Sequence, residues 1–162
     1  MQSWKKFEYR VKDFLISRGY KASRVPLSGS APAIKGDVIA ERGSLKLRID
    51  AKSTRSGARI RISRASLEKL LREASQGEVP LLVFSFYRHP RLYAVVDETL
   101  LNLNARLSEK RTWARNSVGI EKEEVLKAAK RGEGLLIRFK DDRRGYAVLE
   151  LPRLLEMLEA GQ

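Results

Sequence analysis

Three acidic residues and one lysine occupy positions that folding alone does not favour. Asp37 stands near the start of an expected strand, where aspartate is depleted. Asp50 and Lys52 stand near the end of the next expected strand, over 45–52, and share one face because they are two residues apart. If these strands pair around the turn at 42–44, the two aspartates meet at one end of a sheet. Close carboxylates repel unless a cation lies between them, and such oxygen ligands suit magnesium or manganese.

Glu8 is the third carboxylate, and it lies in the apolar stripe of an expected helix over 3–18. The stripe is formed at helical spacing by Trp4, Val11 and Leu15. A carboxylate on this side needs a partner, because burying a lone charge is costly. A metal shared with the two aspartates, or the lysine, would supply one. Two simpler interpretations stay open: Glu8 reaches solvent from the edge of the stripe, and Asp37 is an ordinary acid at a strand end.

The charge distribution indicates a polyanionic partner. The chain has 162 residues and a net charge of +13; residues 1–66 hold 16 Lys and Arg against 5 Asp and Glu, whereas residues 67–162 hold 17 against 15. A basic excess of this kind favours nucleic acid as the partner, with a membrane surface second, and its concentration in one part of the chain argues against a general solubility charge. A solvated basic face is the alternative. The expected DNA contacts are Lys5, Lys6, Arg10, Arg24, Lys35, Arg55, Arg59, Arg61 and Arg64.

Several chemistries are excluded by residue type. The chain has no cysteine, which removes disulfides, thiolate zinc sites and cysteine nucleophiles. Its single histidine, His89, precedes a proline and is interpreted as a turn residue, and Ser28 has no histidine near it in the sequence to make it a nucleophile. No apolar run approaches the roughly 18 residues that span a bilayer, and no secretory segment follows the first residues. We therefore expect a cytoplasmic protein that does not bind membranes.

Helical and strand patterns alternate and predict an α/β fold, with a mixed sheet of about five strands flanked by helices. The expected helices cover 3–18, 64–75 and 98–104. The expected strands cover 21–27, 35–41, 45–52, 59–62, 81–86 and 92–96. Residues 105–119 are polar and aperiodic, which indicates a boundary or a mobile loop. We therefore divide the chain into a core over 1–104 and an extension over 105–162.

The extension is expected to form an αββα unit packed on the core. Its parts are a helix over 121–131, a hairpin of 135–139 and 146–151, and a last helix opening at Pro152. The segments 81–83 and 93–96 resemble 135–137 and 146–149, at offsets of 54 and 53 residues. This echo is consistent with a duplicated helix–hairpin–helix unit, although apolar strands often look alike. The two hairpins could form a subunit interface, or the second could extend the sheet within one chain.

The acid pattern resembles that of the PD-(D/E)XK nuclease superfamily. The segments that carry the resemblance are Gly36-Asp37-Val38-Ile39-Ala40 and Ile49-Asp50-Ala51-Lys52-Ser53. With Glu8 in the first helix and the Ser28-Gly29-Ser30 loop, residues 4–97 are similar to archaeal-type Holliday junction resolvases, Hjc-like enzymes also found in phages. Two positions depart from the family pattern: Asp50 stands where glutamate is usual, and Tyr9 where arginine commonly follows the helix acid.

The resemblance implies a restriction-endonuclease-like fold and a Mg²⁺-dependent endodeoxyribonuclease, with Mn²⁺ as a possible substitute. It implies metal ligands at Glu8, Asp37 and Asp50 and at the Ala51 carbonyl, with Lys52 acting on the attacking water. Ser28 would lie near the scissile phosphate. Divalent ions can activate water and stabilise the leaving oxygen, so no histidine base is needed.

The resemblance also implies a substrate and an assembly. The substrate would be branched DNA, specifically a four-way junction resolved by paired symmetric nicks during recombination and repair. A twofold homodimer would supply two equivalent sites. If the protein were encoded by a phage, its compartment would be the cytoplasm of the host cell. Two other functions stay open: a restriction-like or repair nuclease acting on duplex, flap or single-stranded DNA, and a non-catalytic DNA-binding protein.

Overall fold

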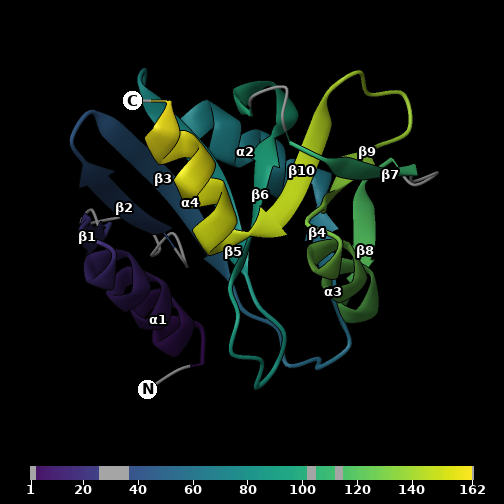
Figure 1. Cartoon of the computed structure of the whole chain (residues 1–162), viewed down its shortest axis with the longest axis horizontal. Coiled ribbons are helices and arrows are strands. Elements are labelled where there is room, and N and C mark those ends of the chain that lie inside the picture. Colours follow the sequence, from purple (N-terminus) through teal and green to yellow (C-terminus); the bar gives the residue numbers. More distant parts are fainter. Residues whose placement is uncertain (1–2, 26–36, 102–104, 112–114, 162) are drawn as a thin grey trace.

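Apolar strands build one large sheet at the centre of the molecule, as the computed structural model shows (Figure 1). The structure describes residues 3–25, 37–101, 105–111 and 115–161. Within these residues the sheet has eight strands in the order β1-β2-β3-β5-β6-β10-β9-β7, and β4 and β8 form a separate pair. The strands are β1 (Lys21–Arg24), β2 (Asp37–Arg42), β3 (Leu45–Lys52), β4 (Arg59–Ser63), β5 (Glu78–Phe84), β6 (Tyr93–Asp97), β7 (Leu107–Arg111), β8 (Ser117–Glu121), β9 (Gly134–Arg138) and β10 (Gly145–Glu150).

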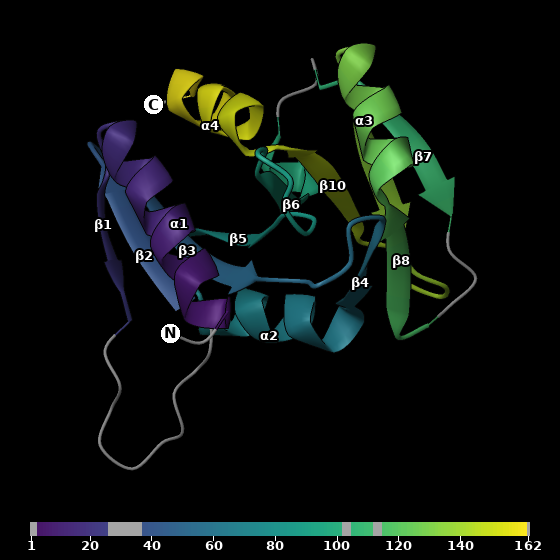
Figure 2. The same ribbon diagram turned by 90° about the horizontal axis from the view of Figure 1, so that it is seen from below.

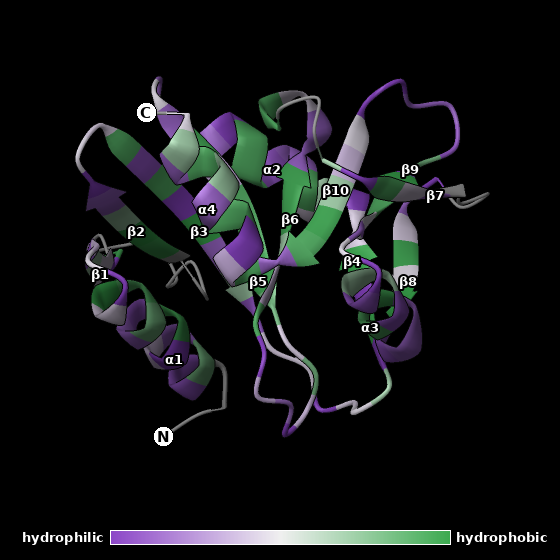
Figure 3. Ribbon diagram, viewed as in Figure 1, coloured by the Kyte–Doolittle hydropathy of each residue, from purple (hydrophilic) through white to green (hydrophobic). Residues whose placement is uncertain are grey.

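The helices cover both faces of this sheet. They are α1 (Ser3–Ser17), α2 (Arg64–Glu73), α3 (Lys122–Lys130) and α4 (Leu151–Ala160), with a 3₁₀ turn η1 (Glu98–Leu100). Apolar residues of α1 and α4 pack on one face, and those of α2, α3, β4 and β8 pack on the other (Figure 2). The strands between the two cores, β5, β6 and β10, are the most apolar part of the ribbon (Figure 3). Strands buried on both faces are expected to read as continuous apolar runs.

Local sequence signals explain why these elements form where they do. In β3 the buried positions alternate with partly exposed ones, so Leu47, Ile49 and Ala51 face the α1 core. Helix α2 begins after Ser63, whose hydroxyl oxygen accepts a hydrogen bond from the Ser66 backbone N–H. The expected αββα unit is confirmed as α3, β9, β10 and α4.

The pairing of β6 with β10 decides how the second hairpin is used. Strands β9 and β10 form the expected hairpin, and β10 also runs antiparallel to β6. The second hairpin therefore extends the sheet within one chain, which was one of the two alternatives. Strand β3 lies parallel to β5 through the α2 crossover, as parallel neighbours require.

Three expectations from the sequence are wrong. Residues 105–119 include β7 and part of β8, where the sequence predicted a loop. Strand β8 has only two buried apolar residues, Val118 and Ile120, between polar neighbours, and β7 lies at the edge of the sheet. The expected helix over 98–104 is only the η1 turn within its described residues, and the sheet exceeds five strands. In the described part of the chain, no helix has both the length and the apolar character needed to span a membrane.

Candidate active site

The hairpin of β2 and β3 brings the two aspartates together. Asp37 and Asp50 are direct partners in the antiparallel register, and Gly43, with φ of 60°, lies in the turn that joins the strands. The expectation that these acids meet at one end of the sheet is therefore confirmed at the level of the backbone. The side chain of Asp37 lies outside the described part of the structure.

Asp50 and Lys52 project from the face of the sheet that α2 covers. Their partners on β5 are Leu82 and Phe84, whose side chains belong to the core under α2. Burial raises the pKa of the Asp50 carboxyl above its usual range, and the charges of Lys52 and the nearby Lys69 oppose that rise. A desolvated carboxylate gains most from a cation placed beside it.

The ammonium group of Lys52 is held in place by α2. Its Nζ donates a hydrogen bond to Ser66 Oγ at 3.1 Å, and Ser66 Oγ accepts a second one from Ser63 Oγ at 2.7 Å. Because Ser63 also caps the helix, the lysine is tied to the first turn of a well-defined element. Its positive charge therefore has a fixed place on the same face as Asp50.

Glu8 is buried, as the sequence predicted, and the interpretation that it reaches solvent is wrong. Its exposed fraction is 2%, and its neighbours Phe7 and Val11 belong to the core between α1 and the sheet. One carboxylate oxygen lies 3.3 Å from an Arg24 guanidinium nitrogen. Arg24 also lies over the ring of Tyr9, at 5.1 Å from its centroid. The position of Glu8 is thus on the α1 side, whereas Asp50 and Lys52 project toward α2.

The donor set fits a hard divalent cation. Asp50 offers a carboxylate, Asp37 lies directly opposite, and the Ala51 carbonyl belongs to the same strand end. Oxygen ligands of this kind suit Mg²⁺ and Mn²⁺. Among the side chains that the structure describes, no three acids are close enough to hold a metal together. A shared metal site for Glu8, Asp37 and Asp50 therefore stays a prediction.

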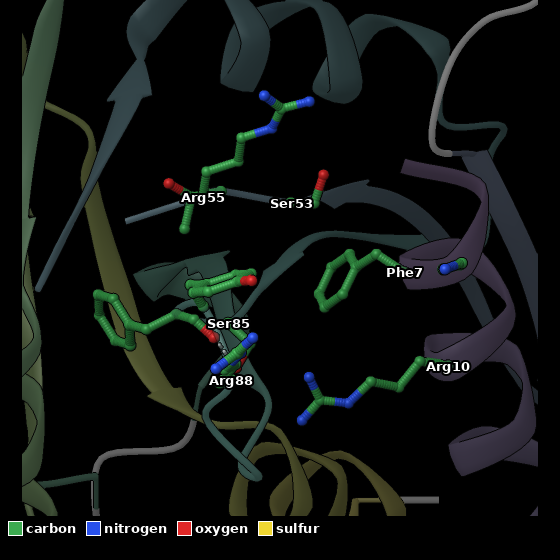
Figure 4. A pocket seen from close by; sticks show the side chains of 10 residues that line it. Phe7, Arg10, Ser53, Arg55, Ser85 and Arg88 are labelled. Atoms are coloured by element: carbon green, nitrogen blue, oxygen red, sulfur yellow. Dashed lines mark hydrogen bonds between the residues drawn. The ribbon is translucent and has the colours of Figure 1, made fainter. Parts of the chain in front are cut away.

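A basic cleft of about 780 Å³ opens beside the strand that carries these residues (Figure 4). Its lining consists of Lys6, Phe7 and Arg10 from α1, Ser53, Thr54 and Arg55 after β3, and Ser85, Phe86, Tyr87 and Arg88 after β5. Ser53 follows Lys52 directly in the chain, so the cleft begins where the expected catalytic residues end. Arg10 extends across it and donates a hydrogen bond to the His89 carbonyl at 2.9 Å. Three of the predicted DNA contacts, Lys6, Arg10 and Arg55, are brought together here.

Two residues of this cleft were missed in the sequence. Tyr87 is half exposed, and the Arg88 guanidinium lies over its ring at 5.1 Å from the centroid. The signal that could have found them was an aromatic and a basic residue side by side in the turn between two apolar strands. His89, interpreted as a turn residue, does lie in this turn, and its ring hydrogen-bonds the Tyr93 hydroxyl at 2.7 Å.

The other predicted DNA contacts that the structure describes do not line the cleft. Arg59 and Arg61 share the exposed face of β4, as their alternation predicted. Arg59 forms an ion pair with Glu121, and Arg61 donates to Ser117 Oγ at 2.9 Å. Arg64 forms one ion pair along α2, with Glu68, and one with Asp142 in the β9–β10 turn. Lys5 is half-buried on α1, and Ser28 and Lys35 lie outside the described residues.

A mixed sheet with paired acids and a lysine at the ends of neighbouring strands defines a protein with a nuclease-like fold. Residues 2–131 match the family model of the archaeal Holliday junction resolvase (Hjc). The chain belongs to this family.

Known proteins that resemble the chain include a viral nuclease and an archaeal resolvase. A crossover junction endodeoxyribonuclease of Sulfolobus islandicus rod-shaped virus 1 is 32% identical over 71 residues, which are 44% of this chain and 58% of that protein. The match thus spans little more than half of the viral protein. The structure of Archaeoglobus fulgidus Hjc, a Holliday junction resolvase from an archaeal hyperthermophile, has a TM-score of 0.53 and 20% identity, covering 74% of this chain and 88% of that one. Because the two sequences are only 20% identical, this structural similarity is evidence for a shared fold alone.

Proposed function

We propose that the protein is a metal-dependent endonuclease that cuts four-way DNA junctions. The observation that carries this proposal is the register of β2 and β3, which sets Asp37 opposite Asp50 two residues before Lys52. The basic cleft beside them offers contacts for phosphates. Membership of the Hjc family and the name of the viral relative, a crossover junction endodeoxyribonuclease, support a junction as the substrate.

Different residues of the chain have different roles in the proposed hydrolysis. Lys6, Arg10 and Arg55 bind phosphates of the DNA backbone, which positions the duplex without reading its sequence. Asp37 and Asp50 would hold the divalent cation, with the Ala51 carbonyl as a further ligand that the family resemblance implies. Glu8, the other ligand that the resemblance implies, lies on the α1 side with Arg24, so we propose Asp37 and Asp50 as the principal ligands. When bound, Mg²⁺ or Mn²⁺ lowers the pKa of a water and offsets charge on the leaving oxygen. Lys52, held by Ser66, stabilises the charge that develops on the phosphate as water adds and one P–O bond breaks.

A symmetric pair of nicks needs two such centres on one junction. Each chain offers one pair of opposed aspartates, so we propose that two copies of the chain serve each junction. A twofold homodimer, which the resemblance implies, and two separately bound chains both meet this requirement. Since the proposed substrate is DNA, we propose that the protein acts in the cytoplasm, which is that of a host cell if the protein is viral.

The test is a cleavage assay on three labelled DNAs: a four-way junction, a linear duplex and a flap. We expect nicks near the branch point of the junction alone, in Mg²⁺ or Mn²⁺ and not in a chelator. Asp50→Asn should reduce the cutting rate by more than about 100-fold, because it removes a direct metal ligand, and losing a residue that only supports such a ligand costs up to about 100-fold. Junction binding should stay intact. Preference for the duplex or flap would indicate a restriction-like or repair nuclease, and binding without cutting would indicate a non-catalytic DNA-binding protein.

A further inference from the structure

The strand order of the large sheet repeats itself in reverse. On one side β3 lies parallel to β5 and β5 antiparallel to β6; on the other β7 lies parallel to β9 and β9 antiparallel to β10. β6 and β10 meet in the middle. In both series a short strand and a helix come between the first and second members, β4–α2 and β8–α3. The unit β3-β4-α2-β5-β6 therefore recurs as β7-β8-α3-β9-β10 (Figure 1).

The registers place a pseudo-twofold axis between the two units. Val95 and Val148 pair with each other, and their partners on the next strands are Leu82 and Leu135. The spacing is 53 residues in both cases, so the offset of 54 expected for the first strand of the sequence echo is wrong by one. The shift matters because a slip of one residue reverses the face of every side chain.

The small sheet obeys the same axis. Its central pair is Arg61 with Gly119, at a spacing of 58 residues. Backbone hydrogen bonds at its ends come as a symmetric pair: the Arg64 N–H donates to the Asn116 carbonyl and the Lys122 N–H to the Ala58 carbonyl, both at 2.8 Å. The residues of each bond are related to those of the other by the same spacing.

Details that topology does not impose also repeat. The rings of Phe86 and Tyr93 meet at 5.8 Å and 65°, and those of Phe139 and Tyr146, 53 residues later, meet at 6.1 Å and 79°. In the described residues, the non-glycine positions with positive φ are Arg88 (57°) and Asp141 (61°), again 53 apart. Equivalent turn bonds accompany them, from the N–H of residue 89 to the carbonyl of 86 and from 142 to 139. Shared strain at matched positions indicates a duplicated unit.

The second unit lacks the metal-binding acids. Ser108 pairs with Leu135 as Asp50 pairs with Leu82, so a serine stands in the place of the aspartate. Lys110 stands in the register position of Lys52. Ser108 Oγ instead donates to Glu133 at 2.6 Å. The chain between β6 and β7 spans only residues 98–106, too short to repeat α1, β1 and β2, which carry Glu8 and Asp37.

The strand edges that meet at this pseudo-twofold axis are covered by the chain itself, because β6 and β10 pair with each other. The apolar hairpins that could have formed a subunit interface pair with each other through β6 and β10. The large apolar side chains exposed in the described part of the chain are Ile16, Tyr87 and Leu100, which lie on separate elements. They do not form the contiguous apolar patch that a stable twofold interface needs.

We infer that the two units of one chain correspond to the two subunits of a twofold dimer. The first unit carries the proposed metal-binding acids and cuts DNA, whereas the second unit has lost these acids. The protein acts as a monomer and makes one nick for each binding event; a second chain, bound separately, makes the other. The substrate in this inference rests on the proposed function, whereas the monomeric state does not.

Molar mass in solution tests the assembly independently of activity. Light scattering after size exclusion, at cutting concentrations and salt, should give the chain mass of 18.4 kDa. Twice that mass would overturn the inference even if the junction is cut. A mass of one chain without any cutting would defeat the proposed function and leave the monomer standing.

A trapped-complex assay tests the single centre. Junction labelled on both cut strands is kept in tenfold excess over protein, and unlabelled junction is added with Mg²⁺ so that released protein cannot rebind. We expect singly nicked product to exceed doubly nicked product by at least tenfold. Resolved duplexes formed during one binding event would contradict the inference.

Variants at equivalent positions provide matched controls in the same assay. Asp50→Asn should remove every nick, whereas Ser108→Ala, at the corresponding position of the second unit, should leave the rate unchanged within twofold. Residual nicking in Asp50→Asn that is abolished in the double variant would place a second centre in residues 107–150, against the inference.

Discussion

Asp50 occupies a setting that disfavours its own charge. Its carboxylate faces α2 and the core beneath it, and burial raises its pKa. In the absence of metal this side chain therefore reduces the stability of the fold at neutral pH, because the charged form is less well solvated than in the unfolded chain. With a cation bound, the same burial strengthens the attraction between the carboxylate and the metal.

Asp50→Asn should therefore stabilise the metal-free protein. We expect its midpoint of thermal unfolding, measured at pH 7 in a chelator, to lie a few degrees above that of the wild type; in a chain of this size about 1 kcal/mol corresponds to 2–4 °C. Asp141→Asn is the control, because Asp141 is exposed and its removal should leave the midpoint unchanged. A lower midpoint for Asp50→Asn would mean that the carboxylate already has a stabilising partner.

The pH dependence of this difference has a defined sign. An acid whose pKa is raised in the folded state binds its proton earlier as pH falls, so folding becomes relatively more favourable below the raised pKa. The gap between Asp50→Asn and wild type should be largest at pH 7 and should shrink toward pH 4. Thermal unfolding in a chelator across this range measures it, and a gap that widens on acidification would contradict the assigned burial effect.

Ser66 accepts a hydrogen bond from Lys52, the lysine that we propose acts in catalysis, so it is a positioning residue. Ser66→Ala removes the acceptor of the 3.1 Å hydrogen bond from Lys52 and keeps the backbone N–H that Ser63 caps. We expect a loss of about tenfold in the single-turnover nicking rate, in line with the 10–100-fold cost of losing an outer-shell group, without a change in junction affinity. Ser63→Ala is the comparison: it should lower stability by about 1 kcal/mol through loss of the cap. Equal rates for Ser66→Ala and wild type would show that the lysine needs no such support.

At the scale of elements, local signals predicted most of the strands and helices. The bounds of β3 and the alternation of β4 follow from patterns of two residues. The opposition of Asp37 and Asp50 was predictable because a short turn fixes the register of a hairpin. Strands β7 and β8 were missed because few of their residues are both apolar and buried. The two that are, Val118 and Ile120, belong to β8. The pairing of both strands comes from contacts with β9 and β4, distant in sequence.

The candidate site likewise combines features that local sequence patterns predict with features that depend on contacts between distant segments. Glu8 was expected to be buried from its place in a helical stripe, but its partner Arg24 was not predicted. The cleft residues Tyr87 and Arg88 join Arg10 only because the end of β5 packs beside α1. Side-chain partners of this kind depend on the packing of whole elements, which periodicity does not encode.

Strand β4 presents a basic edge that should contact DNA phosphates. Arg59→Ala combined with Arg61→Ala should weaken junction binding and reduce the slope of log affinity against log salt by about 1 for each phosphate that these arginines neutralise. The ion pair of Arg59 with Glu121 is exposed, so its loss should cost less than about 1 kcal/mol of stability. Filter binding across a salt series measures the slope.

Lys130→Ala is the matched control for the β4 variant. Lys130 is an exposed cation in the last turn of α3, outside the predicted DNA contacts. Its removal should leave the salt slope unchanged. If both variants reduce the slope equally, binding reflects the overall charge of the chain, and β4 has no particular role.

For the whole molecule, one sheet runs through both the expected core over 1–104 and the expected extension over 105–162. Strands β6 and β10 join them by five residue pairs, from Tyr93 with Glu150 to Asp97 with Tyr146. A shared sheet predicts a single cooperative unfolding transition, in spite of the unequal charge of the two parts of the sequence.

The two tryptophans make this testable, because Trp4 belongs to the first part and Trp113 to the second. Single-tryptophan variants, Trp4→Phe and Trp113→Phe, should report the same denaturant midpoint. Val95→Ala and Val148→Ala, at the pair on the pseudo-twofold axis, each remove buried methyl groups and should each lower the free energy of unfolding by about 1–3 kcal/mol. Both reporters should register both changes, and the double variant should depart from additivity by at least about 0.5 kcal/mol because the side chains are neighbours. If Val148→Ala shifted only the signal of Trp113, the two units would be separate domains that merely touch, and the continuous sheet would not be what holds the molecule together.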